Sequence, residues 1–190
     1  LTASDRSVIY AFLAGKKSIS AIEADHIKSW WKKILLTSYY FFDKNKHILL
    51  NNLQPLNLLK IKHLNIQEPL ICSSKAILSI KNKLEKKGIK NFLIFHPSAQ
   101  YSYKIYPSHL RDQLLTSLNT LGLSILITGT TNVIDLSIEK KLPNFSNIHN
   151  FIGETSLEEY FALSNLALAY IGMDTLNMHI AASQNKRVFA

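Results

Sequence analysis

Three side chains that suit phosphate binding lie close together near the end of the sequence. Asp174, Thr175 and His179 follow an apolar run at residues 166–171, which predicts a fully buried strand. Asp174 or Thr175 can cap a short helix after that strand, and the free N–H groups and positive dipole end of a helix start favour a phosphate. In open α/β sheets ligands bind at this place. An ordinary capped helix with a hydrogen-bonded histidine is the alternative interpretation.

A second stretch with the same organisation lies about 70 residues upstream. An apolar run, Phe-Leu-Ile-Phe, predicts a strand, and a polar loop with one lysine, Lys104, follows it before a helix. A lysine beyond a strand end is suited to bind phosphate oxygens, although a solvated loop lysine is the alternative. Ser98 precedes it in the loop and offers a backbone donor. Gly129 and Thr130 end another predicted strand and are expected to approach the same ligand.

Three short motifs occur in order over about 90 residues. They are His96-Pro-Ser-Ala…Lys104-Ile-Tyr-Pro, Gly153-Glu-Thr-Ser-Leu-Glu-Glu159 and Gly172-Met-Asp-Thr-Leu-Asn-Met-His-Ile-Ala-Ala. Together they resemble the heptosyltransferases, a glycosyltransferase family that builds the lipopolysaccharide inner core of Gram-negative bacteria. The resemblance implies an α/β chain of the GT-B type, with two Rossmann-like parallel-sheet domains, both incomplete in this chain. It implies that residues 1–72 belong to the acceptor-binding domain, 73–90 to an interdomain linker and helix, and 91–190 to the nucleotide-sugar-binding domain.

The same resemblance implies a reaction and a site. The expected reaction is the transfer of heptose from ADP-heptose to the lipopolysaccharide core, in the cytoplasm or on the inner face of the inner membrane, with no metal cofactor. Lys104 matches the family lysine that meets phosphate oxygens, and Asp174, Thr175 and His179 match residues that line the nucleotide-sugar pocket. The family's catalytic carboxylate has no match here. We therefore assign no general base, and we expect this segment alone not to turn over substrate.

The chain departs from the family pattern at three places. Leu176 and Ser98 stand where the family has glycine, and Thr131 or Asn132 replaces an acidic residue that the family often places there. A glycine lets backbone approach a ligand closely, so the leucine side chain is expected to narrow the pocket. The donor is therefore open, and a GT-B enzyme that uses another nucleotide sugar is the alternative.

The whole of the net positive charge lies in the first half of the chain. The formal net charge is +9, and residues 1–88 hold fifteen Lys and Arg against six Asp and Glu. Residues 28–42 interleave lysines with six aromatic side chains. Such a segment suits an anionic membrane surface, an acidic glycolipid or nucleic acid, and equally a core with solvated lysines outside it. A basic nucleic-acid-binding module is the least favoured of these, because no recognisable nucleic-acid motif accompanies the charge.

Ser4 and Arg6 lie in a segment that weakly resembles the middle of the family's acceptor domain. They are expected either to face an anionic acceptor or simply to start a surface helix. The chain begins at Leu1 and ends as a new strand starts, which indicates an internal piece of a longer protein.

Composition and periodicity set the architecture. The chain is 47% hydrophobic and 18% charged, which allows a sizeable core and argues against wholesale disorder. No apolar run approaches the roughly 20 residues of a membrane helix, and the single cysteine, Cys72, excludes an intramolecular disulfide. From residue 90 strands and helices alternate, which predicts a parallel, doubly wound sheet. We expect strands at 92–95, 123–128, 148–152, 166–171 and from 188. We expect helices at 4–13, 47–64 (interrupted near Pro55), 75–87 (capped by Ser74), 108–121, from the loop at 129–132 to about 141, and 155–163. A linker is expected at 66–74.

Overall fold

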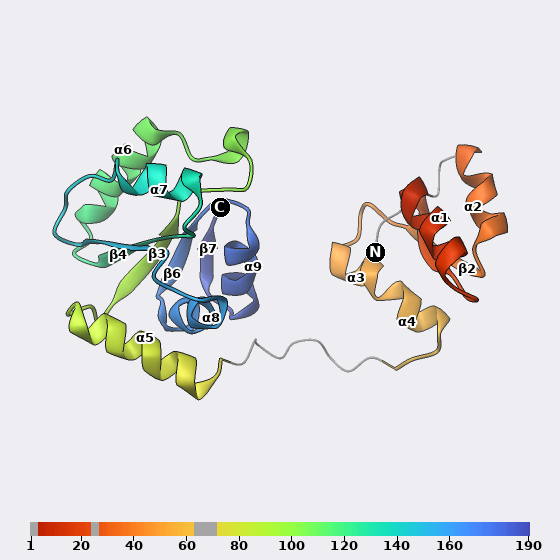
Figure 1. Cartoon of the computed structure of the whole chain (residues 1–190), viewed down its shortest axis with the longest axis horizontal. Helices are drawn as coiled ribbons and strands as arrows, with labels where there is room; N and C mark the ends of the chain where they lie inside the picture. The colour runs from red at the N-terminus through yellow and green to blue at the C-terminus, as the bar shows by residue number, and fades with distance from the viewer. Residues whose placement is uncertain (1–3, 24–26, 63–71) are drawn as a thin grey trace. The chain divides into compact units, whose positions relative to one another are not determined.

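The chain forms two compact units. The computed structural model describes residues 4–23, 27–62 and 72–190, and the chain divides into Leu1–Gln67 and Glu68–Ala190. Figure 1 shows the helices and strands of both units. Each unit has its own sheet and its own apolar core. Within the described ranges, no helix combines the length and apolar character needed to cross a bilayer.

The second unit is built on a five-stranded, fully parallel sheet (Figure 1). The strand order is β5-β4-β3-β6-β7, so the chain fills one side of β3 first and then the other. This arrangement confirms the predicted α/β fold with parallel strands. The strands are β3 (Phe92–His96), β4 (Ser124–Gly129), β5 (Ile148–Ile152), β6 (Ala169–Gly172) and β7 (Arg187–Phe189).

Helices cover both faces of this sheet, and neighbouring residues of a strand pack in different cores because they point to opposite faces. On one face Ile94 of β3 belongs to a core with Ile80 and Leu163 from two of the helices. On the other face Phe95 packs in a core with Leu115. Strands buried on both faces are near-continuous apolar runs, which is why the sequence reveals them. The helices are α5 (Ser74–Lys86), α6 (Ser108–Asn119), α7 (Val133–Glu139), α8 (Leu157–Leu166) and α9 (Leu176–Ser183).

Several predicted boundaries are corrected by the structure. The N-cap of α5 is Ser73, whose Oγ accepts from the N–H of Ala76 at 3.2 Å, and not Ser74. The run at 166–171 is not all strand, because α8 continues through Leu166 and β6 begins only at Ala169. Most of the predicted linker lies outside the described residues, in 63–71. The helix α5 packs against α8 within the second unit.

The strand order reverses at β3. β4 pairs with one edge of β3 and β6 with the other, and Phe95 of β3 is in register with Ile127 and Ile171. At such a switch point the loops that follow the two flanking strands diverge and leave a crevice at the carboxyl end of the sheet. The loops after β3, β4 and β6 therefore converge there.

The first unit has a small two-stranded parallel sheet with short helices. Val8, Ile22 and Leu36 form its buried core, and Trp31 and Tyr39 pack against them. Its elements are α1 (Asp5–Ala14), β1 (Ile19–Glu23), the 3-10 turn η1 (Ile27–Ser29), α2 (Trp30–Leu35), β2 (Ser38–Phe42), α3 (Ile48–Asn52) and α4 (Gln54–Leu58).

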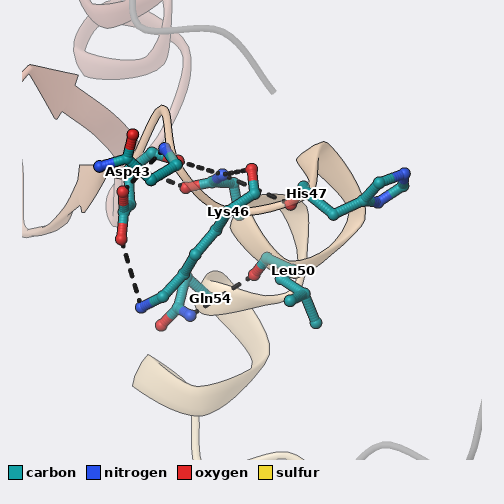
Figure 2. A network of polar contacts seen from close by, with 7 residues as sticks. Asp43, Lys46, His47, Leu50 and Gln54 are labelled. Carbon is teal, nitrogen blue, oxygen red and sulfur yellow. Dashed lines mark hydrogen bonds and ion pairs between the residues drawn. The ribbon is translucent and has the colours of Figure 1, made fainter.

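Local polar contacts hold the loop between β2 and α3 (Figure 2). Lys46 Nζ lies 3.5 Å from Asp43 Oδ2, and Gln54 Nε2 donates to the carbonyl of Leu50 at 3.4 Å. His47 points away from these groups in Figure 2 and caps α3, since its Nδ1 accepts from the backbone N–H two residues further on at 3.2 Å. The polar residues of this loop therefore serve the fold of the first unit.

The interruption predicted near Pro55 within the helix at 47–64 is confirmed, although the helical segment ends earlier than predicted, at Leu58. Two short helices occupy the segment, and the break falls at Leu53, just before Pro55 in the first turn of α4. Proline is tolerated in the first turn of a helix because the backbone N–H groups there make no hydrogen bond within the helix. The helix α4 ends at Leu58, and Lys60 takes a positive φ of 56° that turns the chain away. The predicted positions beyond residue 62, including His63, lie outside the described residues.

Acid is expected to weaken the packing of α5 against α8 through Glu159. Its Oε1 lies 2.8 Å from Lys83 Nζ and accepts from Ser79 at 2.6 Å, while Oε2 accepts from the N–H of Ser156 in a capping box. These bonds, that of Lys83 first, hold the Glu159 pKa at about 2, below the ordinary 4.5. The folded-state pKa is the lower one, so the stabilisation is complete above about pH 4.5 and is lost as pH falls towards 2.

The substitution Glu159→Gln tests this expectation. At neutral pH it should cost up to about 1 kcal/mol, the scale of one ion pair, because glutamine still completes the capping box; it should also flatten the acid dependence. Urea unfolding followed by far-UV circular dichroism from pH 7 to pH 3 measures both effects. Glu158→Gln, at an exposed neighbour on the same helix turn, is the control. An unchanged acid dependence in Glu159→Gln would contradict the assignment.

Candidate nucleotide-sugar site

A pocket of about 730 Å³ opens at the carboxyl ends of β3, β4 and β6. Three loops and the first turns of two helices line it, which is the arrangement expected at the switch point of an open sheet. The end of β3 and the loop after it contribute His96, Ser98, Ala99, Gln100, Tyr101 and Lys104. The loop after β4 and the start of α7 contribute Thr130, Asn132, Val133, Ile134 and Asp135. The loop after β6 and the start of α9 contribute Asp174, Thr175, Leu176 and Asn177.

Five of the sequence-predicted residues meet in this pocket. Ser98, Lys104, Thr130, Asp174 and Thr175 come from three separate loops and all line it. Their common position follows from the parallel register, because the carboxyl ends of neighbouring parallel strands meet at one edge of the sheet.

Other predicted residues lie elsewhere. Gly129 ends β4 but does not line the pocket, and its Cα faces the Asp135 side chain, whose Cγ would lie 2.9 Å from an added Cβ. His179 sits on α9 outside the pocket lining, with its side chain 68% exposed and its Nε2 3.4 Å from Asp174 Oδ1. Ser4 and Arg6 belong to the first unit: Ser4 caps α1 by accepting from the N–H of Ser7, and Arg6 is exposed.

The loop after β3 presents Lys104 at the end of a single 3-10 turn, η2 (Ser102–Lys104). The N–H of Lys104 donates to the carbonyl of Tyr101 at 2.9 Å, which closes the turn. The Lys104 side chain is exposed, and its Nζ lies 6.0 Å from the ring centre of Tyr103. An exposed cation in the pocket lining is thereby available to an anionic ligand.

The loop between β6 and α9 supplies the positive end of a helix. Thr175 takes the N-cap position of α9, but its side chain makes no capping bond. Its Oγ1 is buried and finds no hydrogen-bond partner among the described residues. Leu176 and Asn177 form the first turn and line the pocket, so the unpaired N–H groups of that turn lie beside it.

A buried histidine at the pocket floor is missed by the sequence reasoning. The side chain of His96 is only 6% exposed, and its Nδ1 lies 2.9 Å from the Thr128 carbonyl, to which it must donate because a carbonyl only accepts. Burial, the largest influence, lowers the His96 pKa and favours a neutral ring. Its Nε2 then carries a lone pair and lies 3.4 Å from Ser98 Oγ. The sequence feature that could have identified His96 is its place as the first residue of the His-Pro motif.

A buried carboxylate is missed as well. Asp135 is 2% exposed and lines the pocket from the first turn of α7. Its Oδ2 accepts from the N–H and Oγ1 of Thr130 and from Nδ2 of Asn132. Asn132 in turn caps α7 by accepting from the N–H of Asp135 at 2.9 Å. Asp135 therefore fixes the loop after β4, and no local pattern in the sequence distinguishes it from an ordinary helix residue.

The pocket combines groups that suit a phosphorylated ligand rich in hydroxyls. Lys104 and the N–H groups at the start of α9 suit phosphate oxygens. The His96 lone pair and the Asp174 carboxylate suit hydroxyl donors. Within the described part of the chain, no three His, Cys, Asp or Glu side chains come together as metal ligands.

An open parallel sheet with a pocket at its switch point is the architecture in which many α/β proteins bind their ligands. The sequence profile of glycosyltransferase family 9 (heptosyltransferase) matches residues 45–190. The chain belongs to this family. The curated proteins include no significant sequence match.

Solved structures of family members have the same fold. A glycosyl transferase family 9 protein from Veillonella parvula superposes with a TM-score of 0.74 at 15% identity, over 99% of this chain and 54% of that one. Escherichia coli ADP-heptose lipopolysaccharide heptosyltransferase II gives 0.67 at 17% identity, over 98% and 59%. Escherichia coli heptosyltransferase WaaC with ADP gives 0.61 at 12% identity, over 89% and 52%. This chain thus spans little more than half the length of each.

Proposed function

We propose that this chain is part of a heptosyltransferase that transfers heptose from ADP-heptose to the inner core of lipopolysaccharide. The observation that carries the proposal is the pocket, in which a family 9 chain brings a lysine, a helix start and hydroxyl-binding groups together. Two structurally similar chains hold ADP and ADP-2-deoxy-2-fluoro heptose, according to their descriptions. Residues 91–190 then belong to the nucleotide-sugar domain, 73–90 to a connecting segment and 1–72 to the acceptor domain.

Four of the predicted site residues have roles in this proposal. Lys104 neutralises the diphosphate as it binds and as it leaves, so that no metal ion is required for this task. Thr175 and the N–H groups at the start of α9 bind phosphate or sugar oxygens. Asp174 orders the loop or contacts a sugar hydroxyl, since a carboxylate repels phosphate. His179, at the Asp174 side of the rim, donates to a phosphate oxygen. No general base is assigned in this chain.

In this proposal the first unit binds the acceptor and contacts the membrane that holds it. Its α2–β2 region exposes Trp30, Ile34 and Phe41, while Lys33 Nζ lies 5.4 Å from the Phe41 ring centre. Aromatic rings beside lysine heads suit the headgroup region of an anionic membrane, where the lipopolysaccharide acceptor is held. This arrangement supports peripheral attachment to the inner face of the inner membrane.

Calorimetric titration of ADP, GDP and UDP tests the nucleotide assignment. Selective ADP binding is expected, and Lys104→Ala should weaken it about 10- to 100-fold, because a charge-assisted hydrogen bond to phosphate is worth about 1.5–3 kcal/mol. His179→Ala should also weaken it, by less, since this ring is largely exposed. Lys90→Ala, an exposed lysine before β3 at the opposite end of that strand, is the matched control. Unchanged ADP affinity in Lys104→Ala with an intact fold would refute the site assignment.

A second candidate is a transferase of the same fold that uses another nucleotide sugar. The favouring observation is Leu176, which stands where the family pattern has glycine and lines the pocket with its side chain 60% exposed. A bulky side chain in the first turn of α9 reduces the space beside the phosphate-binding N–H groups. Selective binding of GDP or UDP in the same titrations would favour this candidate over ADP-heptose.

A further inference from the structure

Two tyrosines form an exposed stacked pair beside Lys104. The ring centres of Tyr101 and Tyr103 are 5.6 Å apart, and their planes differ by 18°. Tyr101 is 51% exposed and Tyr103 is 78% exposed. Each ring shields one face of the other, and the pair leaves its remaining aromatic surface open to solvent beside the pocket.

The pair is held by a rigid turn. The N–H of Lys104 donates to the Tyr101 carbonyl at 2.9 Å, which fixes the backbone across η2. The N–H of Tyr106 then donates to the Pro97 carbonyl at 3.1 Å and closes the whole loop. The Tyr106 ring packs edge-on against buried Phe95 of β3, with ring centres 6.1 Å apart. The tyrosine pair is therefore anchored to the sheet and is preorganised for binding.

The pair adjoins the phosphate-binding end of the pocket. Tyr101 and Lys104 both line the pocket, and Lys104 Nζ lies 6.0 Å from the Tyr103 ring centre. In a nucleotide sugar the glycosyl group is bonded directly to the terminal phosphate, whereas the ribose and the other phosphate separate the base from it. If Lys104 binds the terminal phosphate, the glycosyl group is the part of the ligand within reach of the rings.

We propose that Tyr101 and Tyr103 form a stacking subsite for the glycosyl group of the nucleotide sugar. A sugar ring has an apolar face of C–H groups that packs on an aromatic ring, while its hydroxyls remain free for polar partners at the pocket. This inference rests on the proposed function, because it requires the diphosphate at Lys104. It adds a recognition element for the transferred sugar that acts separately from nucleotide binding.

The test compares two ligands that differ only in the glycosyl group. ADP and ADP-heptose are titrated calorimetrically, without acceptor, into the wild-type chain and into Tyr103→Ala and Tyr103→Phe. Tyr103→Ala should weaken ADP-heptose about 5- to 10-fold, the effect of losing one aromatic contact, and change ADP less than about 2-fold. Tyr103→Phe keeps the ring and should bind both ligands as the wild type does. Tyr10→Ala, which removes a similarly exposed tyrosine from α1, is the control for nonspecific effects.

The outcomes separate this inference from the proposed function. Equal weakening of ADP and ADP-heptose by Tyr103→Ala would place the rings at the nucleotide and overturn the subsite. Unchanged affinity for both ligands would overturn the subsite and leave the proposed function standing. Failure of the folded wild-type chain to bind ADP would overturn the ADP-heptose proposal, and the subsite with it.

Discussion

Replacing Gly172 by alanine is expected to destabilise the second unit by more than about 3 kcal/mol. Gly172 ends β6 with a φ of +157°, which L residues rarely adopt. An added Cβ would overlap the carbonyl oxygen of His96 and lie 2.9 Å from Tyr170 Oη. That Oη donates to the Met173 carbonyl, and the Met173 N–H donates to the same His96 carbonyl. The substitution therefore separates β3 from β6 at the floor of the pocket.

Gly122→Ala is the matched control for this experiment. Gly122 also has a positive φ, +65°, but an added Cβ would meet no atom within 4 Å. It should cost only the backbone strain, about 1–2 kcal/mol. Urea unfolding followed by far-UV circular dichroism measures both variants. Both tryptophans, Trp30 and Trp31, lie in the first unit, so their fluorescence should report a first-unit transition that neither substitution moves. Equal destabilisation by the two substitutions would refute the steric argument.

Loss of the Asp135 carboxylate is expected to destabilise the second unit by about 2–4 kcal/mol. The alanine variant leaves the N–H of Thr130 and the side chain of Asn132 without their shared acceptor. It also removes a negative charge from the first turn of α7, where the helix dipole favours one. Asp135→Asn keeps an acceptor oxygen but loses the charge, so its cost should be smaller.

The same unfolding assay measures these variants, with Glu158→Ala as the control for an exposed carboxylate in a first helix turn. Because Asp135 fixes the loop that carries Thr130, Asp135→Asn should also weaken ADP binding in the titrations described above. Asp135→Ala with the stability of Glu158→Ala would show that the buried hydrogen bonds contribute nothing.

The fold was largely predictable because its strands are buried on both faces. An apolar run such as that of β3 predicts a buried strand with few other assignments when turn residues and a helix follow it. The convergence of Ser98, Lys104 and Thr175 followed from the same reasoning, since parallel strands present their following loops at one edge. These site residues were inferred from their position after strands and from motif resemblance.

What could not be predicted depends on contacts between distant segments. His96 and Asp135 are identified by burial and by partners on other elements, such as the Thr128 carbonyl on β4. His179 lies on the predicted helix, but its ring is exposed beside Asp174 outside the pocket lining. The direction in which a helical side chain points depends on where the helix begins. An error of one residue in the predicted start changes the expected direction by about 100°.

The strand order also bears on how the protein is made. β3 pairs with β4, its neighbour along the chain, but its other edge pairs with β6, where Leu93 is in register with Ala169. During synthesis the first half of the sheet can form while that edge of β3 is still uncovered. We infer that the pocket is completed only when β6 and α9 have left the ribosome. Until then one edge of β3 has no partner strand, and the nascent chain is most vulnerable to pairing with other chains.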